Sequence, residues 1–210
     1  MTILLRYIDE KVGAKFAKRV PLLQKKIGAV PFERRKLRDY GVAGNTFRAF
    51  RGFRQKSSEI FAAWAERQVS QIDTRQLCRK LRTRQGFINW HGDLTANLAK
   101  HWKLVGKKNL SLAHRYKLVD LFVKWLSKYQ FRQGNIAVLL ERNANCPIDS
   151  QTLIALNKAY SNALPLGTVY MSHVSCEATY NFCQDAIGEF ARRFGGTRLL
   201  FDYYAWKKGG

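Results

Sequence analysis

Apolar residues recur three and four positions apart through much of this chain, and this spacing constrains its fold more than any other feature. The clearest case lies between residues 112 and 126, where six positions follow the pattern: Leu112, Tyr116, Val119, Phe122, Val123 and Leu126. That spacing places them on one face of an amphipathic helix. No segment shows the sustained alternation of apolar and polar residues typical of a half-buried strand. The sequence therefore predicts a mostly α fold, a compact helical domain that can form two lobes with a cleft between them.

Capping residues predict where several helices begin. Ser111 precedes the helix just described, and Asp73 precedes another. Their side-chain oxygens can accept hydrogen bonds from the first backbone N–H groups of a helix. A third helix is predicted from Ser57 or Ser58 to Gln71.

Three further segments are less regular. The stretch from Lys11 to Lys26 has helical spacing, but Pro21 predicts a break or a new helix start within it. The stretch from Gly86 to Lys100 contains two glycines and little periodicity, which favours a loop. A long helix is predicted from about Ser172 to the glycines at 195 and 196.

Positive charge is concentrated in the first two thirds of the chain. Residues 1–142 contain 31 Lys and Arg against 10 Asp and Glu, whereas residues 143–210 contain 6 against 5. Such a surplus is useful mainly when a polyanion binds it. We expect a basic helical body over 1–142 and a nearly neutral part over 143–210, within one continuous globular unit. The expected partner is double-stranded DNA, with RNA as the alternative, because phosphate contacts give affinity without sequence information.

Composition excludes several classes of protein. With 46% apolar and 13% aromatic residues, the chain can bury a core and differs from a disordered basic tail. No apolar run approaches the roughly eighteen residues of a membrane span. The first residues do not resemble a secretion signal. The sequence thus predicts a cytoplasmic protein without a membrane segment and without an obligate protein partner.

The cysteines are scattered singly, and none forms a Cys-x-x-Cys pair. They are Cys78, Cys146, Cys176 and Cys183. His173, Cys176 and Cys183 can converge on a metal, but a zinc site normally has a second close pair of ligands. We therefore expect free thiols, no metal and no cofactor.

Two basic segments are predicted to contact phosphates. One is the loop and first helical turns around residues 107–117, and the other is an upstream segment in which arginines alternate with phenylalanines. There, cations can bind phosphates while rings stack on bases. The alternative for the upstream segment is an amphipathic helix with buried rings and solvated arginines. The predicted DNA-contacting cations are Lys107, Lys108, Arg115, Lys117, Arg48, Arg51 and Arg54.

One short motif can support chemistry, because Cys146-Pro147-Ile148-Asp149 opens a predicted helix. Pro147 presets the first turn, and Asp149 stands where a carboxylate accepts backbone N–H groups and faces the positive end of the helix dipole. The structural interpretation is a helix cap that contributes about 1 kcal/mol. The catalytic interpretation is a fixed carboxylate that stabilises an oxocarbenium-like sugar or orients the attacking water.

This motif resembles the segment in which DNA glycosylases of the helix-hairpin-helix superfamily place their catalytic aspartate. In that family Pro, Val or Ile, and Asp start a helix late in an all-helical fold, so the resemblance implies that Asp149 is catalytic. The family's upstream glycine-rich turn is reduced here to Gln133-Gly134-Asn135. No lysine matches a Schiff-base role, although Lys128 is near, which implies a monofunctional glycosylase. In size and basicity the chain also resembles small antiviral glycosylases that remove glucosylated hydroxymethylcytosine from phage DNA.

A flipped base needs aromatic walls and polar groups that read it. The residues predicted to form such a pocket are Tyr170, Tyr203, Trp206, Trp90, His91 and Asn89. The structural alternative places Trp90 in the core and His91 on the surface. For the C-terminal aromatic residues, the alternative is packing onto the core with Asp202 exposed.

These features favour a DNA glycosylase that flips a modified base and leaves an abasic site, in defence against phage DNA. The main alternative is a non-enzymatic nucleic-acid-binding protein in which Asp149 is only a cap. A metal-dependent nuclease ranks last, because it needs clustered carboxylates and the 15 acidic residues are scattered.

Overall fold

The computed structural model describes most of the 210-residue chain. The described residues are 4–33, 37, 39–42, 46–47, 56–106, 109–132, 134–164 and 170–206. Five predicted DNA-contacting residues lie outside them: Arg48, Arg51, Arg54, Lys107 and Lys108.

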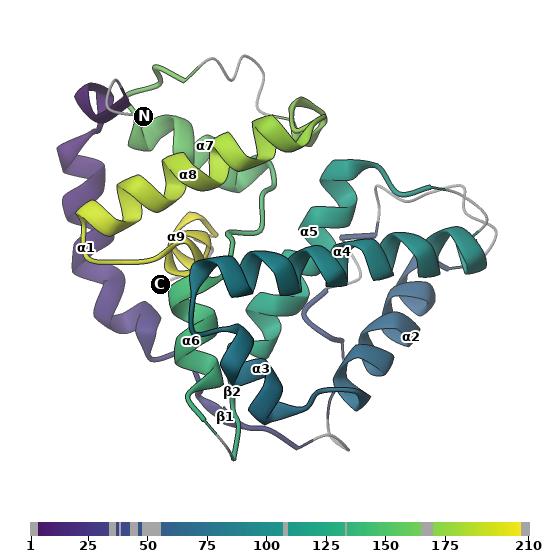
Figure 1. Cartoon of the computed structure of the whole chain (residues 1–210). Helices are drawn as coiled ribbons and strands as arrows, with labels where there is room; N and C mark the ends of the chain where they lie inside the picture. Colours follow the sequence, from purple (N-terminus) through teal and green to yellow (C-terminus); the bar gives the residue numbers. More distant parts are fainter. Residues whose placement is uncertain are drawn as a thin grey trace.

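The fold is mostly α, as predicted (Figure 1). The α-helices are α1 (Glu10–Gln24), α2 (Ser57–Ser70), α3 (Thr74–Lys80), α4 (Arg84–Gly106), α5 (Leu112–Leu126), α6 (Ile136–Asn143), α7 (Ser150–Ala159), α8 (Glu177–Arg193) and α9 (Arg198–Ala205). Short 3-10 helices occupy Leu4–Tyr7 and Met171–His173. Two short strands, β1 (Val30–Pro31) and β2 (Tyr129–Gln130), pair in parallel. None of the helices in the described ranges is long and apolar enough to cross a membrane.

Three of the predicted capping residues begin their helices, whereas Ser57 and Ser58 lie inside α2, whose N-cap position is Lys56 and has no side-chain cap among the described residues. The Ser111 hydroxyl accepts the His114 N–H at the start of α5. The Asp73 carboxylate accepts two N–H groups at the start of α3, and Asp149 accepts the Thr152 N–H at the start of α7. Local side-chain chemistry therefore fixes these three helix starts.

The predicted loop over residues 86–100 is wrong, because those residues belong to α4. Its buried face includes Phe87, His91, Leu94 and Leu98 at helical spacing. The two glycines have separate explanations. A Cβ on Gly86 would lie 2.1 Å from the carbonyl oxygen of Lys80, whereas Gly92 has nothing within 4 Å of such a Cβ. Gly86 thus permits a close approach of α3 and α4, and tertiary packing outweighs the low helix propensity of glycine.

Two helix boundaries also differ from the prediction. Pro21 lies inside α1 and does not break it, because Val20 and Leu23 on either side are buried in the core. Helix α8 begins at Glu177, since the chain forms a separate 3-10 turn at Met171–His173. It ends where expected, before Gly195 in the left-handed region at φ +75°.

Two hydrophobic cores divide the helices into two halves. The first core is built from α2 to α6, and the second from α1, the segment after Asn143, and α7 to α9. Helix α1 belongs to the basic N-terminal part of the sequence, but in the fold it packs with the C-terminal helices α7, α8 and α9 (Figure 1). Phe16 of α1 contacts the rings of Phe190 and Phe201, with centroids 5.8 and 6.0 Å away. Helix α5 lies between the two halves, with Tyr116 packed on the second core and Phe122 in the first.

Candidate functional site

A line of buried polar side chains runs between the two cores, and we call it the polar seam. Its members come from α4, α5, the 143–149 segment, α8 and α9: Arg84, His91, Lys117, Asp120, Lys124, Asn145, Asp149, Tyr180 and Asp202. Helix α5 contributes Lys117, Asp120 and Lys124, which are spaced to share one face. Each of the three pairs with a different residue from elsewhere in the fold.

Asp120 is the central acid of the seam and is fully buried. Its two oxygens accept hydrogen bonds from Nε2 of His91 and the hydroxyl of Tyr180, each over 2.8 Å. Burial raises the pKa of Asp120, while His91, Tyr180 and Arg84 act in the opposite direction. Asn145 donates to the Tyr180 hydroxyl over 2.8 Å. Asp120, His91, Tyr180 and Asn145 are therefore joined in one hydrogen-bonded network, which offsets the cost of burying them.

Arg84 connects the first half of the molecule to the segment before Asp149. Its guanidinium donates to the Asn143 carbonyl and, over 2.6 Å, to Oδ1 of Asn145. Burial lowers the pKa of Arg84 to about 10. Gln184 of α8 holds the same segment from the other side by bonding both the N–H and the carbonyl of Cys146, over 2.9 and 2.7 Å. The approach to Asp149 is therefore fixed by side chains from both halves.

Asp149 stands at the start of α7 with its two oxygens in different environments. Oδ1 accepts from the backbone N–H and the hydroxyl of Thr152, over 3.0 and 3.1 Å. Oδ2 accepts no hydrogen bond from the described residues and lies 3.7 Å from the ammonium of Lys117. The side chains of Asp149 and Lys117 are 7% and 17% exposed. The carboxylate is thus rigid and almost buried, with only a long ion pair at one oxygen.

Asp202 forms the third pair of the seam and corrects a prediction. The expected position at the surface is wrong, because Asp202 is fully buried against the ammonium of Lys124. That ammonium also lies over the ring of Tyr203, 4.3 Å from its centroid. Oδ1 of Asp202 has no hydrogen-bond partner among the described residues. Burial raises the pKa of Asp202, and Lys124 opposes that shift.

The residues predicted to surround a flipped base are spread over several parts of the described structure. His91 is buried in the seam. The predicted loop around it and the alternative surface position are therefore both wrong. Asn89 is exposed on α4 and accepts a hydrogen bond from Gln85. Tyr170 and Trp206 are 63% and 46% exposed, whereas Tyr203 is half-buried beneath Lys124.

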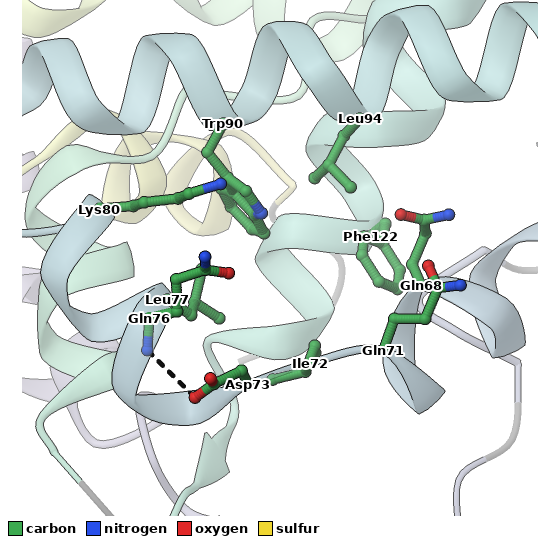
Figure 2. A pocket seen from close by; sticks show the side chains of 10 residues that line it. All are labelled: Gln68, Gln71, Ile72, Asp73, Gln76, Leu77, Lys80, Trp90, Leu94 and Phe122. Carbon is green, nitrogen blue, oxygen red and sulfur yellow. Dashed lines mark hydrogen bonds between the residues drawn. The ribbon is translucent and has the colours of Figure 1, made fainter.

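Trp90 lines a hollow of about 170 Å³ between α2, α3 and α4 (Figure 2). Its indole faces Leu77, Gln76 and Lys80 of α3, with Gln68 and Gln71 at the far side. Asp149 does not line this hollow. Trp90 also packs against the first core. Its structural alternative placed it in the core, and the side chain is only partly buried there.

Sequence reasoning missed Tyr116 and Arg84 as members or neighbours of the site. The rings of Tyr116 and Tyr180 lie 4.2 Å apart between centroids, and Tyr116 donates to Glu177 over 3.0 Å. The predicted phosphate contact Arg115 lies over the Tyr116 ring at 5.8 Å, and Lys117 faces Asp149. In the sequence, Lys117, Asp120 and Lys124 share a side of the 112–126 helix away from its apolar face, which is equally typical of a solvated surface.

Among the described residues, no three His, Cys, Asp or Glu side chains are grouped so as to hold a metal ion. All four cysteines are free thiols.

Alkylation with iodoacetamide is expected to modify Cys176 first. Cys176 is exposed, and hydrogen bonding to Thr179 lowers its pKa. Burial raises the pKa of Cys146 and Cys183, the latter to about 11, which disfavours the reactive thiolate. Peptide mass spectrometry of a native time course should show Cys176 modified well before Cys146 and Cys183, and urea should remove the difference. Equal native rates for Cys176 and Cys146 would contradict the fold around α7 and α8.

The fold and the site define a class: a mostly helical, cationic protein in which an aspartate is held at the start of a helix. Comparison with known proteins adds no narrower assignment. No protein-family model matches the chain, no curated protein matches it in sequence, and no solved structure matches it in fold.

Proposed function

We propose that this protein binds DNA and hydrolyses the N-glycosidic bond of a flipped, modified base, leaving an abasic site. The net charge of +22 supports the nucleic-acid partner. The Pro147-Ile148-Asp149 segment, which begins α7 in an all-helical fold, supports the chemistry. The substrate class implied by the resemblance is a modified base in phage DNA, such as glucosylated hydroxymethylcytosine.

The observation that carries the proposal is the asymmetry of the Asp149 carboxylate. Thr152 occupies Oδ1 with two hydrogen bonds, whereas Oδ2 has only the ammonium of Lys117 at 3.7 Å. A rotation of Lys117 toward a DNA phosphate would free Oδ2 while Thr152 keeps the carboxylate in place. A preorganised anion of this kind stabilises positive charge that develops in a transition state without reorganising at that moment.

In the proposed reaction the bond between C1′ and the base nitrogen breaks, and its electron pair leaves with the base. Asp149 stabilises the resulting oxocarbenium-like sugar. Water adds its oxygen to C1′, and its released proton balances the charge taken up by the departing base. The products are the free base and an abasic site.

A second candidate is a nucleic-acid-binding protein without catalysis. The observation that favours it is the 5% exposure of Asp149. In that case Lys117 and Asp149 form a structural pair that joins α5 to α7, and Asp149 acts only as a helix cap.

The test is incubation of the protein with duplex and single-stranded DNAs that contain natural and modified bases, glucosylated hydroxymethylcytosine included. Alkali cleaves the strand at abasic sites, and gel shifts on the same DNAs and on matched RNA measure binding. Alkali-dependent cleavage of at least one modified DNA is the expected result. Binding with intact strands across the panel would leave the second candidate, and preferential RNA binding would remove DNA as the partner.

A further inference from the structure

Three arginines lie on one side of α3 and the turn after it. Arg75, Arg79 and Arg82 are all exposed. Arg75 and Arg79 are four residues apart on one face of α3, and Arg82 follows in the turn after the helix. Together with Thr74, Cys78 and Gly134 they line a surface hollow of about 470 Å³. The hollow lies on α3 away from Trp90, since the two hollows share none of their lining residues.

None of these guanidinium groups forms an ion pair within the described part of the chain. Several other cations do have acidic partners, among them Lys117, Lys124, Arg193 and Arg198. Three neighbouring cations without counter-charges repel one another, and that repulsion is relieved when an anion binds.

Gly134 forms the other wall of the hollow. It has φ +73°, and a Cβ there would lie 2.9 Å from the Cys78 sulfur. Glycine therefore allows the turn between α5 and α6 to lie directly against the arginine face of α3. The wall is formed by backbone and a small side chain, which leaves the guanidinium groups accessible from solvent.

We propose that this hollow, the α3 arginine face, binds the phosphodiester backbone of the nucleic acid. Guanidinium groups bind phosphate oxygens through two parallel hydrogen bonds, which favours arginine over lysine for this task. Arg75 and Arg79 are separated by about 6 Å along the axis of α3, and Arg82 lies beyond the end of that helix, so the three long side chains can reach successive phosphates of one strand. The inference deepens the proposed function and rests on its nucleic-acid partner, but it does not depend on catalysis.

The test compares two triple variants with equal charge loss. One is Arg75→Gln/Arg79→Gln/Arg82→Gln. The control is Lys11→Gln/Lys15→Gln/Lys18→Gln on α1, where three exposed lysines have the same spacing and no ion pair with a described residue. Fluorescence anisotropy measures the affinity for a labelled duplex at several chloride concentrations. Thermal unfolding followed by circular dichroism checks that both variants fold.

The arginine variant should reduce the slope of log affinity against log salt by about 2 to 3, since each lost phosphate contact removes about 0.9. The lysine variant should change the slope by less than about 1. Inorganic phosphate at matched ionic strength should compete weakly, because a single anion cannot span three sites.

Equal effects of the two variants, or no effect of the arginine variant, would overturn the proposal. So would displacement of the duplex by millimolar phosphate, or binding to an acidic polypeptide or anionic vesicles in preference to DNA. Absence of abasic sites would refute the proposed catalysis and leave this comparison of binding intact.

Discussion

Replacing Asp149 with asparagine is expected to lower the rate of abasic-site formation by about a hundredfold or more, while the affinity for DNA and its salt dependence stay unchanged. The asparagine oxygen can still accept the Thr152 N–H, so the start of α7 is retained. The neutral amide cannot stabilise a positively charged sugar or accept a proton from water. Single-turnover cleavage assays and anisotropy titrations on the same duplex separate these two properties.

The matched control is Asp9→Asn. Asp9 caps α1 in the same way, with its carboxylate accepting the N–H groups of Lys11 and Val12 over 2.9 and 3.0 Å. A general effect of weakening a capped helix would appear in both variants, whereas catalysis predicts a loss only at Asp149. If Asp149→Asn keeps full activity, the carboxylate mechanism is wrong, and if it loses DNA affinity, Asp149 serves the architecture and not the reaction.

Local chemistry explains which parts of this fold could be predicted from the sequence. Ser111, Asp73 and Asp149 bond to backbone groups two or three residues away, so short segments contain the information for these helix starts. The helix over residues 112–126 was predictable for the same reason, since its apolar positions repeat within one segment. Gly86 was misleading because it lets the carbonyl of Lys80, at the end of α3, approach the start of α4, and a glycine in the sequence is equally typical of a loop.

The polar seam could not be predicted, because its pairs join residues far apart in the chain. Asp120 and Tyr180 are 60 positions apart, and Lys124 and Asp202 are 78. Asp202 sits among aromatic residues, and the sequence there is equally compatible with an exposed charge. Only the docking of α9 and α5 brings a lysine to it and makes burial tolerable. The sequence identified Asp149 but not Lys117 as its partner, since a cation in a strongly basic segment was assigned to phosphate.

Replacing Lys124 with methionine is expected to be among the most destabilising single changes in this protein, at about 3–5 kcal/mol of unfolding free energy. The variant leaves the fully buried Asp202 without its cation. Oδ1 of Asp202 already accepts no hydrogen bond from the part of the chain that the structure describes. The double variant Lys124→Met/Asp202→Leu should recover most of the loss, because it removes both charges from the interior. Urea unfolding at pH 7 measures the three free energies, and additive losses in the double variant would show that the two residues are not coupled.

The pH dependence and a neighbouring lysine provide the control. Burial already raises the pKa of Asp202, and losing Lys124 removes the main opposing influence. The folded variant therefore binds a proton more tightly than the unfolded chain, so its stability should rise relative to wild type as the pH falls from 7 toward 5.

Lys128→Met removes a cation one helical turn away, whose pKa is lowered by burial and by Lys124 and Lys26. Since Lys128 has no ion pair with a described residue, its loss should change stability by less than about 1 kcal/mol. A large loss at both positions would mean that apolar packing of the lysine stems, and not the buried ion pair, stabilises the contact between α5 and α9.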